Sequence, residues 1–232
     1  MQLKAEGSAT EDWYEVGPLN KPNLGLNNIG QGSEPGIGPI RFLTMKSDQP
    51  DTMFCGSIGG LFYTYDAGLN WANAGSDAWE ISSCKDAVFN VTDHYIWYAV
   101  NNGFWGYAGG IRRTTDAGMH WEIIADLSDF YHAGVWTQVN KLLTDPNDQN
   151  ILYAASADRL WRTLNANSTN PIWSEVTIPI PSTISNDPIY GTYPFTDNRY
   201  VYDLEMKPND SQTLYASVRY EAIVSETDKV HY

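Results

Sequence analysis

The stretch that decides the fold is residues 64–71, which read Thr-Tyr-Asp-Ala-Gly-Leu-Asn-Trp and recur at residues 114–121 as Thr-Thr-Asp-Ala-Gly-Met-His-Trp. The aspartates of the two copies are 50 positions apart (116 minus 66). A third copy at residues 162–167 keeps the pattern in part and is followed by Trp173. A unit of this length is too long for one hairpin and predicts a repeat architecture.

The residue types of this repeat suit a tight turn between two strands. A carboxylate can accept hydrogen bonds from N–H groups of the loop, and glycine adopts a positive φ at little cost. Threonine suits the strand before the turn, and tryptophan the strand after it, where it fills space between sheets. We therefore expect the repeat residues to be structural and not catalytic: Thr64, Asp66, Gly68, Trp71, Thr114, Asp116, Gly118 and Trp121.

A second repeated element lies ahead of the turn. Residues 48–56, 145–154 and 207–216 each contain a turn rich in Pro, Asn and Asp beside apolar runs, which predicts a hairpin. Hairpin and turn together make units of four strands. We therefore predict an all-β fold, a β-propeller of four-stranded blades, present as a partial propeller of about three and a half blades. The expected blades cover about residues 39–75, 83–124, 138–176 and 200–232.

Composition narrows the range of partners. The formal net charge is −14 and the isoelectric point is near 4.5. This charge argues against nucleic acid, anionic membrane surfaces and polyanionic glycans as main partners, because all three recruit clustered Lys and Arg. No run of about 18 apolar residues is present, so no membrane span is expected. No motif indicates a metal or a cofactor. Cys55 and Cys84 leave two alternatives open, one disulfide bridge or two free thiols.

The repeats resemble those of Asp-box propellers (bacterial neuraminidase repeats), which include sialidases, sortilin-type propellers and two-propeller xyloglucan-cleaving glycosidases. The start of the chain is similar to propellers of exported Bacteroidetes proteins that use type IX secretion. It has Trp-Tyr-Glu-Val-Gly-Pro at residues 13–18 and Gly-Ser-Ile-Gly-Gly-Leu at residues 56–61. The resemblance implies a bacterial extracellular or cell-surface protein, with residues 1–232 as the N-terminal portion of one propeller domain. It also implies that a strand at residues 13–16 completes the last blade and removes an exposed sheet edge.

The resemblance also bears on catalysis. In the xyloglucan-cleaving family a catalytic Asp precedes the Ile-Gly-Gly of the first blade. Ser57 stands at that position here, and a hydroxyl of ordinary pKa cannot replace a carboxylate of a glycoside hydrolase. Sialidases carry an early Arg-Ile-Pro motif, whereas residues 39–41 read Pro-Ile-Arg, so we expect Arg41 to be an inner-strand residue or a salt-bridge partner. No catalytic residue is therefore expected in this segment.

Propellers present ligands to the loops around the central channel, where inner strands begin and second strands end. Aromatic faces stack on sugar rings, so the aromatic-rich segments supply the candidate ligand-binding residues: Trp105, Tyr107, His132, Trp136 and Tyr193. We predict a secreted or cell-surface propeller that binds a glycan or a protein partner, without catalysis in this segment. Two alternatives stay open. One is a fragment of a xyloglucanase- or sialidase-like glycoside hydrolase with catalytic residues partly in other blades, and the other is a structural subunit of an export or adhesion assembly.

Overall fold

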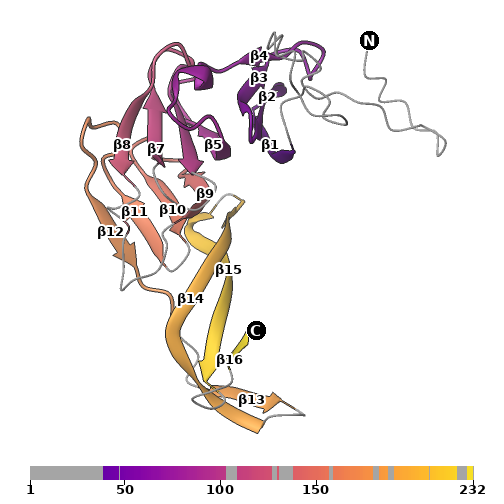
Figure 1. Cartoon of the computed structure of the whole chain (residues 1–232). Coiled ribbons are helices and arrows are strands. Elements are labelled where there is room, and N and C mark those ends of the chain that lie inside the picture. The colour runs from indigo at the N-terminus through magenta and orange to yellow at the C-terminus, as the bar shows by residue number, and fades with distance from the viewer. Residues whose placement is uncertain are drawn as a thin grey trace, which may run out of the picture.

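The computed structural model describes residues 39–46, 48–102, 109–126, 130, 138–156, 159–179, 183–187, 191–208, 210–223 and 229–231. Regular structure in these residues is β-strand, apart from a 3-10 turn at Ser76–Ala78 and a 3-10 residue at Phe130. The strands form four antiparallel sheets of four strands each, which follow one another along an arc (Figure 1). The predicted all-β class with four-stranded blades is thereby confirmed. The strand expected at residues 13–16 lies outside the described residues.

All four sheets are meanders, in which each strand pairs with its neighbour along the chain. The first sheet contains β1 (Ile40–Lys46), β2 (Gln49–Ser57), β3 (Gly60–Thr64) and β4 (Ala72–Asn73). The second contains β5 (Cys84–Phe89), β6 (Trp97–Asn102), β7 (Gly109–Thr114) and β8 (Glu122–Asp126). The third contains β9 (Val139–Thr144), β10 (Leu152–Ser156), β11 (Leu160–Thr163) and β12 (Trp173–Val176). The fourth contains β13 (Thr183–Asp187), β14 (Gly191–Lys207), β15 (Asp210–Ile223) and β16 (Lys229–His231).

The fourth sheet begins earlier in the chain than the start near residue 200 that the sequence indicated. Strand β14 begins at Gly191, and β13 precedes it. The hairpin of β14 and β15 extends from Phe195, opposite Ala222, to Lys207, opposite Asp210. The run Gly-Thr-Tyr-Pro-Phe-Thr that opens β14 is rich in Thr and aromatic residues. Because such residues favour strands, the segment continues the hairpin instead of forming a loop.

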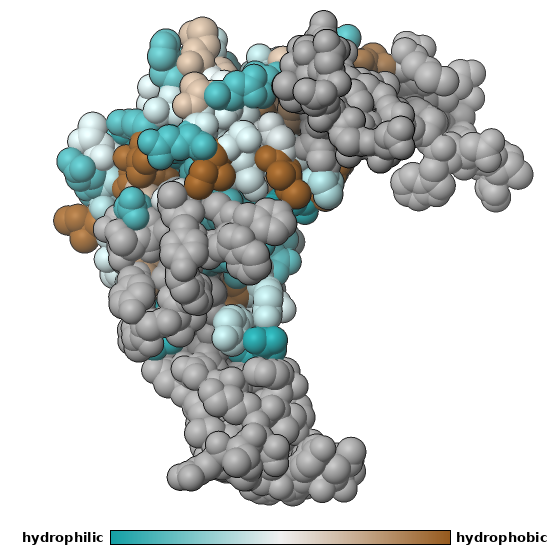
Figure 2. All heavy atoms as spheres, in the orientation of Figure 1, coloured by the Kyte–Doolittle hydropathy of each residue, from teal (hydrophilic) through white to brown (hydrophobic). Residues whose placement is uncertain are grey.

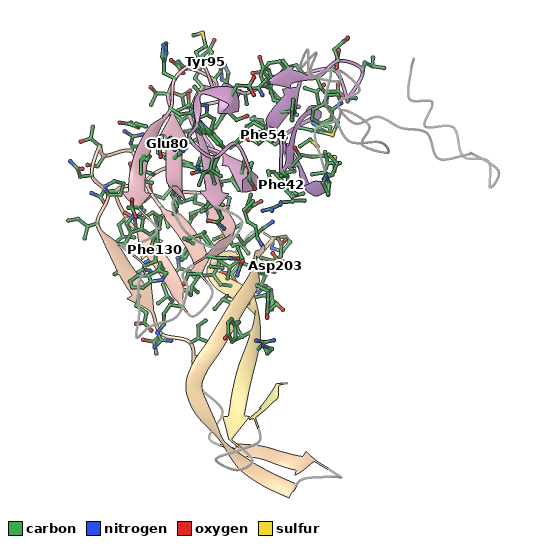
Figure 3. All side chains as sticks on the ribbon, in the orientation of Figure 1. Phe42, Phe54, Glu80, Tyr95, Phe130 and Asp203 are labelled. Carbon is green, nitrogen blue, oxygen red and sulfur yellow. The ribbon has the colours of Figure 1, made fainter. Side chains whose placement is uncertain are left out.

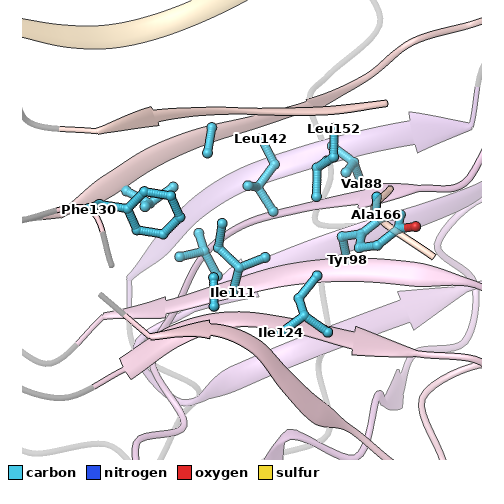
Figure 4. Close-up of a cluster of buried hydrophobic side chains, with 12 residues drawn as sticks. Val88, Tyr98, Ile111, Ile124, Phe130, Leu142, Leu152 and Ala166 are labelled. Carbon is cyan, nitrogen blue, oxygen red and sulfur yellow. The ribbon is translucent and has the colours of Figure 1, made fainter. Parts of the chain in front are cut away.

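The hydrophobic core lies between the sheets. In β6, Trp97 and Ala99 belong to a cluster shared with the first sheet, whereas Tyr98 and Val100 belong to a cluster shared with the third. Successive residues of a strand point to opposite faces, and all four of these side chains are fully buried. Figure 4 shows the cluster between the second and third sheets, and another lies between the third and fourth. An interior blade is therefore buried on both faces by its neighbours.

The repeated turn has the same hydrogen bonds in each copy. Asp66 Oδ1 accepts from the hydroxyl of Thr64 at 2.7 Å and from the N–H of Asn70 at 2.8 Å. The other copies repeat both bonds, with Asp116 accepting from Thr114 and His120, and Asn165 accepting from Thr163 and Ile172. Hydrogen bonds from the side chain and the N–H of Asn70 lower the pKa of Asp66 to about 2. The carboxylate is thus a fixed acceptor inside the turn.

The first two copies of the turn have a positive φ at two successive residues, of which the sequence indicated only the glycine. The φ angles are 55° at Ala67 and 86° at Gly68, and 57° at Ala117 and 89° at Gly118. Such a pair of angles is that of a type I′ turn. Gly118 has a second reason to be glycine, because an added Cβ would lie 2.9 Å from the carbonyl oxygen of Ala74 in the first sheet. The second turn therefore packs closely against the preceding blade.

Further hydrogen bonds join each turn to its own blade and to its neighbours. The alanine N–H of the turn donates at 2.9 Å to a carbonyl near the start of the second strand: Ala67 to Asp51, Ala117 to Tyr95 and Ala166 to Asn150. Between blades, Trp121 Nε1 donates to the carbonyl of Ala74 at 2.7 Å. Arg113 donates to the carbonyl of Ala166 at 2.9 Å. These hydrogen bonds consequently fix each turn to the second strand of its own blade and join neighbouring blades to one another.

Replacing Asp116 by alanine is expected to lower the free energy of unfolding by about 1–2 kcal/mol, because the N–H of His120 and the hydroxyl of Thr114 lose their acceptor. Asp116→Asn is expected to cost less, since Asn165 supplies the acceptor in the third copy. Urea denaturation followed by tryptophan fluorescence measures both variants. Equal losses in the two variants would contradict the acceptor role.

Candidate functional site

The first strands of the four hairpins share one irregularity. β1 pairs Ile40 with Ser57 and Phe42 with Gly56, so Arg41 has no residue opposite it. The bulge recurs in the other blades, where the residue without an opposite partner is Lys85 in β5, Asn140 in β9 and Tyr202 in β14. A β-bulge re-aims a side chain and is frequent next to functional sites. Since these strands contact one another in series, the four bulges lie together on the inner side of the arc.

The bulged residues and those that follow them line one cavity of about 380 Å³. Each blade contributes two consecutive residues: Arg41 and Phe42, Lys85 and Asp86, Asn140 and Lys141, Tyr202 and Asp203. Figure 3 labels Phe42 on the first sheet and Asp203 on the fourth, both on the inner side of the arc. Phe42 lies over strand β2 because Gly56 opposite it has no side chain, and a Cβ there would be 1.8 Å from the ring.

The cavity carries charges of both signs. Arg41, Lys85 and Lys141 come from the first three blades, and Asp86 and Asp203 from the second and fourth. Lys141 Nζ lies 3.9 Å from Asp203 Oδ1, which joins the third and fourth blades. Burial and the nearby charge of Arg41 lower the pKa of Lys85. At neutral pH three cations face two carboxylates, so the cavity is locally positive in a chain of formal charge −14.

Asp86 is the buried acid of the cavity. The residue is 2% exposed, and its Oδ2 accepts the N–H of Leu142 at 2.7 Å. It therefore satisfies a backbone donor on the inner strand of the next blade. Burial raises the pKa of Asp86 to about 6, against the opposing effects of Lys141 and of the Leu142 N–H. A cavity carboxyl that titrates this close to neutral pH is a common feature of functional sites.

Ser57, which stands where the resembling glycosidases have a catalytic Asp, closes a turn. The residue is fully buried, and its hydroxyl oxygen accepts the N–H of Gly59 at 3.0 Å. At the same position, Ser156 in the third blade accepts the N–H of Arg159 and Asn101 in the second accepts the N–H of Gly110, at 3.1 Å in both cases. In three blades this side chain therefore accepts a backbone N–H from the next part of the chain.

The structure places the residues that the sequence singled out as follows. Trp105, Tyr107, His132 and Trp136 lie outside the described residues. Tyr193 lies in β14, where it pairs with Ile184, but its side chain is outside the described part. Cys55 and Cys84 are buried free thiols. Arg41 is in an inner strand, as expected.

The sequence analysis did not identify the other residues of the cavity, although one signal could have found them. The four hairpins align without a gap, and in each the first residue pairs with the last: residues 40–57, 84–101, 139–156 and 201–218. The first residue of each range is Ile, Cys, Val or Val, and the second, which is the bulged residue, is Arg, Lys, Asn or Tyr. A variable, non-aliphatic position next to a conserved apolar one within four internal repeats indicates a shared surface.

No protein-family model matches the sequence, and no curated protein matches it. Among solved structures, an ancestral GH74 enzyme matches with a TM-score of 0.52 and 14% identity, over 83% of this chain and 25% of its own. The GH74 xyloglucanase from Xanthomonas campestris gives 0.50 and 15%, over 82% and 29%. The extracellular domain of a proposed one-component system from B. thetaiotaomicron gives 0.51 and 15%, over 86% and 23%.

The chain is part of a β-propeller. Successive four-stranded meanders with cores between them are the architecture of this fold, and the three neighbours share it. The likeness is one of fold, because the identity is 14–15%. The chain spans about a quarter of the length of these neighbours. In the part of the chain that the structure describes, no helix has the length and apolar character needed to cross a membrane.

The raised pKa of Asp86 predicts an effect of pH on stability. Between the ordinary value of 3.8 and about 6, the folded protein holds a proton on Asp86 that the unfolded chain has lost. The contribution of Asp86 to the free energy of unfolding therefore falls as pH rises through this window. Above it, the buried charge costs on the order of 3 kcal/mol.

Asp86→Asn keeps an oxygen acceptor for the N–H of Leu142 and removes this charge. Relative to the native protein, the variant is expected to gain stability as pH rises from about 4 to about 7.5. Chemical denaturation at a series of pH values in this range measures the difference. A difference that stays constant with pH would show that Asp86 does not titrate as described.

Proposed function

We propose that this chain is part of a secreted or cell-surface propeller that binds a glycan in the cavity of the inner strands, without catalysis in this segment. The observation that carries the proposal is the bulge that recurs at one position of four successive blades. Packing between blades is accounted for by the apolar clusters on the strand faces. The bulged side chains line the cavity and are not needed for this packing.

The chemistry of the cavity suits a sugar. Its volume of about 380 Å³ is within the range of small-ligand sites. Asn140 and Asp203 offer hydrogen-bonding groups, and Tyr202 offers an aromatic face that is 47% exposed. The ring of Tyr202 lies at 23° to that of Tyr200 with centroids 6.4 Å apart, and Arg219 lies 6.0 Å from the centroid of Tyr202. An exposed aromatic ring beside polar groups is a common platform for a sugar ring.

The fold comparison supports the same proposal by analogy. Two of the neighbours are GH74 enzymes, one of them a xyloglucanase, and the third is an extracellular domain. A structural subunit of a larger assembly would instead present a large apolar patch. On the face drawn in Figure 2, the apolar side chains of the described residues occur in small groups among polar ones.

A glycoside hydrolase is the second candidate, and one observation favours it. Asp86 and Asp203 line the same cavity, and the pKa of Asp86 is raised to about 6, as an acid catalyst requires. Binding is the better account, because a general acid must reach the glycosidic oxygen. Asp86 is 2% exposed and its Oδ2 already accepts the N–H of Leu142.

Tyr202→Ala is expected to weaken glycan binding about tenfold, because it removes the exposed aromatic face from the cavity. The native protein is first screened on a glycan array, and the affinity for the best glycan is then measured by calorimetry. Tyr215→Ala is the matched control, since Tyr215 is 58% exposed on the neighbouring strand β15 and does not line the cavity. Equal effects of the two substitutions would place the binding site elsewhere.

A reducing-sugar assay on the same glycans separates the two candidate functions. We expect binding without release of sugar. Release that is abolished by Asp86→Asn and by Asp203→Asn would establish the hydrolase instead. If the protein shows no binding and releases no sugar, both candidates are overturned and a role in assembly is favoured.

A further inference from the structure

We propose that the glycan bound in this cavity is acidic, and that its anionic group binds between Arg41 of the first blade and Lys85 of the second. The inference rests on the proposed function and deepens it by naming the ligand class. The group is a carboxylate or a sulfate on an oligosaccharide, because both present anionic oxygens that a guanidinium and an ammonium group recognise.

Arg41 and Lys85 are cations without a carboxylate partner among the described residues. Five other Lys or Arg side chains of the described residues form ion pairs with carboxylates: Lys46 with Asp48, Arg113 with Glu122, Lys141 with Asp203, Arg159 with Glu175 and Lys207 with Asp210. Within the described part of the chain, neither Arg41 nor Lys85 takes part in an ion pair. They occupy the same bulge position of adjacent blades and line the same cavity.

The carboxylates of the cavity are engaged on its other side. Asp203 lies 3.9 Å from Lys141, and Oδ2 of Asp86 accepts the N–H of Leu142. Both partners belong to β9 in the third blade. Lys141 of the third blade and Asp203 of the fourth therefore compensate one another. The first two blades bring the two cations Arg41 and Lys85 against the single carboxylate of Asp86, so this wall keeps a net positive charge.

Two like charges at one wall repel each other, and an anion relieves that repulsion. The interaction is visible on Lys85, whose pKa is lowered by burial and by the charge of Arg41. Hydrogen bonds to a charged partner are stronger than neutral ones. Binding of an anion at this wall is thus favoured by attraction to both cations and by loss of their mutual repulsion.

The test compares three probes on the full chain: a hexuronic-acid oligosaccharide, the same oligosaccharide with its carboxyl groups methyl-esterified, and a sulfated oligosaccharide. We expect an anionic probe to bind about tenfold or more tightly than the neutral ester. The carboxylated and sulfated probes separate the two sources of the anionic group. The preference is expected to shrink when salt is raised, because salt screens the attraction.

The variants assign the preference to the two residues. Arg41→Gln and Lys85→Gln are expected to reduce it to about twofold, and Arg41→Lys to retain most of it, since that substitution keeps the charge. Lys207→Gln is the control, because Lys207 pairs with Asp210 away from the cavity. Circular dichroism establishes whether each variant is folded. If Arg41→Gln does not fold, Lys85→Gln still tests the site.

Three outcomes are distinguishable. The inference is supported if the protein prefers the acidic probe to its neutral ester, and if substitution of Arg41 or Lys85 removes this preference while substitution of Lys207 does not. Equal affinity for the acidic probe and its neutral ester overturns the inference and leaves glycan binding in place. Absence of binding to all three probes and to every glycan of the array overturns the proposed function together with the inference.

Discussion

The structure depends on one packing constraint, which is that the second strand of an interior blade is apolar on both faces. Trp97 and Tyr98 are neighbours in β6, and both are fully buried although they point to opposite sides. Burial of such side chains stabilises the fold by roughly 2–3 kcal/mol each. A blade by itself would expose both faces. An interior sheet therefore needs a neighbour on each side, and the series of blades follows from this requirement.

The same constraint leaves the inner strand as the place for polar chemistry. In the first three blades the innermost strand pairs on one side only, so part of its backbone donors and acceptors faces the inner side of the arc. Asp86 satisfies one of these donors, the N–H of Leu142. The bulges then direct side chains to the same region without disturbing the apolar positions before and after them, such as Val139 and Leu142 in β9. Packing and binding consequently use different residues of one strand.

The sequence predicted the parts of the fold that rest on local chemistry. The repeated turn, the hairpins ahead of it and the strands of the first blade follow from the order of Thr, Asp, Gly and apolar residues. It did not indicate the positive φ of Ala67 and Ala117, because alanine has no preference for that conformation and adopts it only where the turn demands it. The hairpin of β14 and β15 begins before residue 200, where the aromatic run has the composition of a strand as well as that of a binding loop.

The cavity was the least predictable feature, for a physical reason. A bulge adds one residue to a strand and leaves the hydrophobic alternation on either side intact, so the pattern of a single hairpin does not reveal it. Nor does the sequence show that Asp86 is buried beside Lys141, since the two residues are far apart in the chain and meet only when adjacent blades pack. Each of these features depends on how one blade is placed against the next.

The contrast between the whole chain and its cavity restricts the ligand further. The chain has a formal charge of −14, which repels an extended polyanion over its whole surface. At physiological ionic strength, exposed charges are screened beyond about 8 Å, so a group inside the cavity responds mainly to Arg41, Lys85, Lys141, Asp86 and Asp203. The two effects together select a ligand that is short or sparsely charged and that enters the cavity with an anionic group. A densely charged polymer would gain the same local contact but lose more at the surrounding acidic surface.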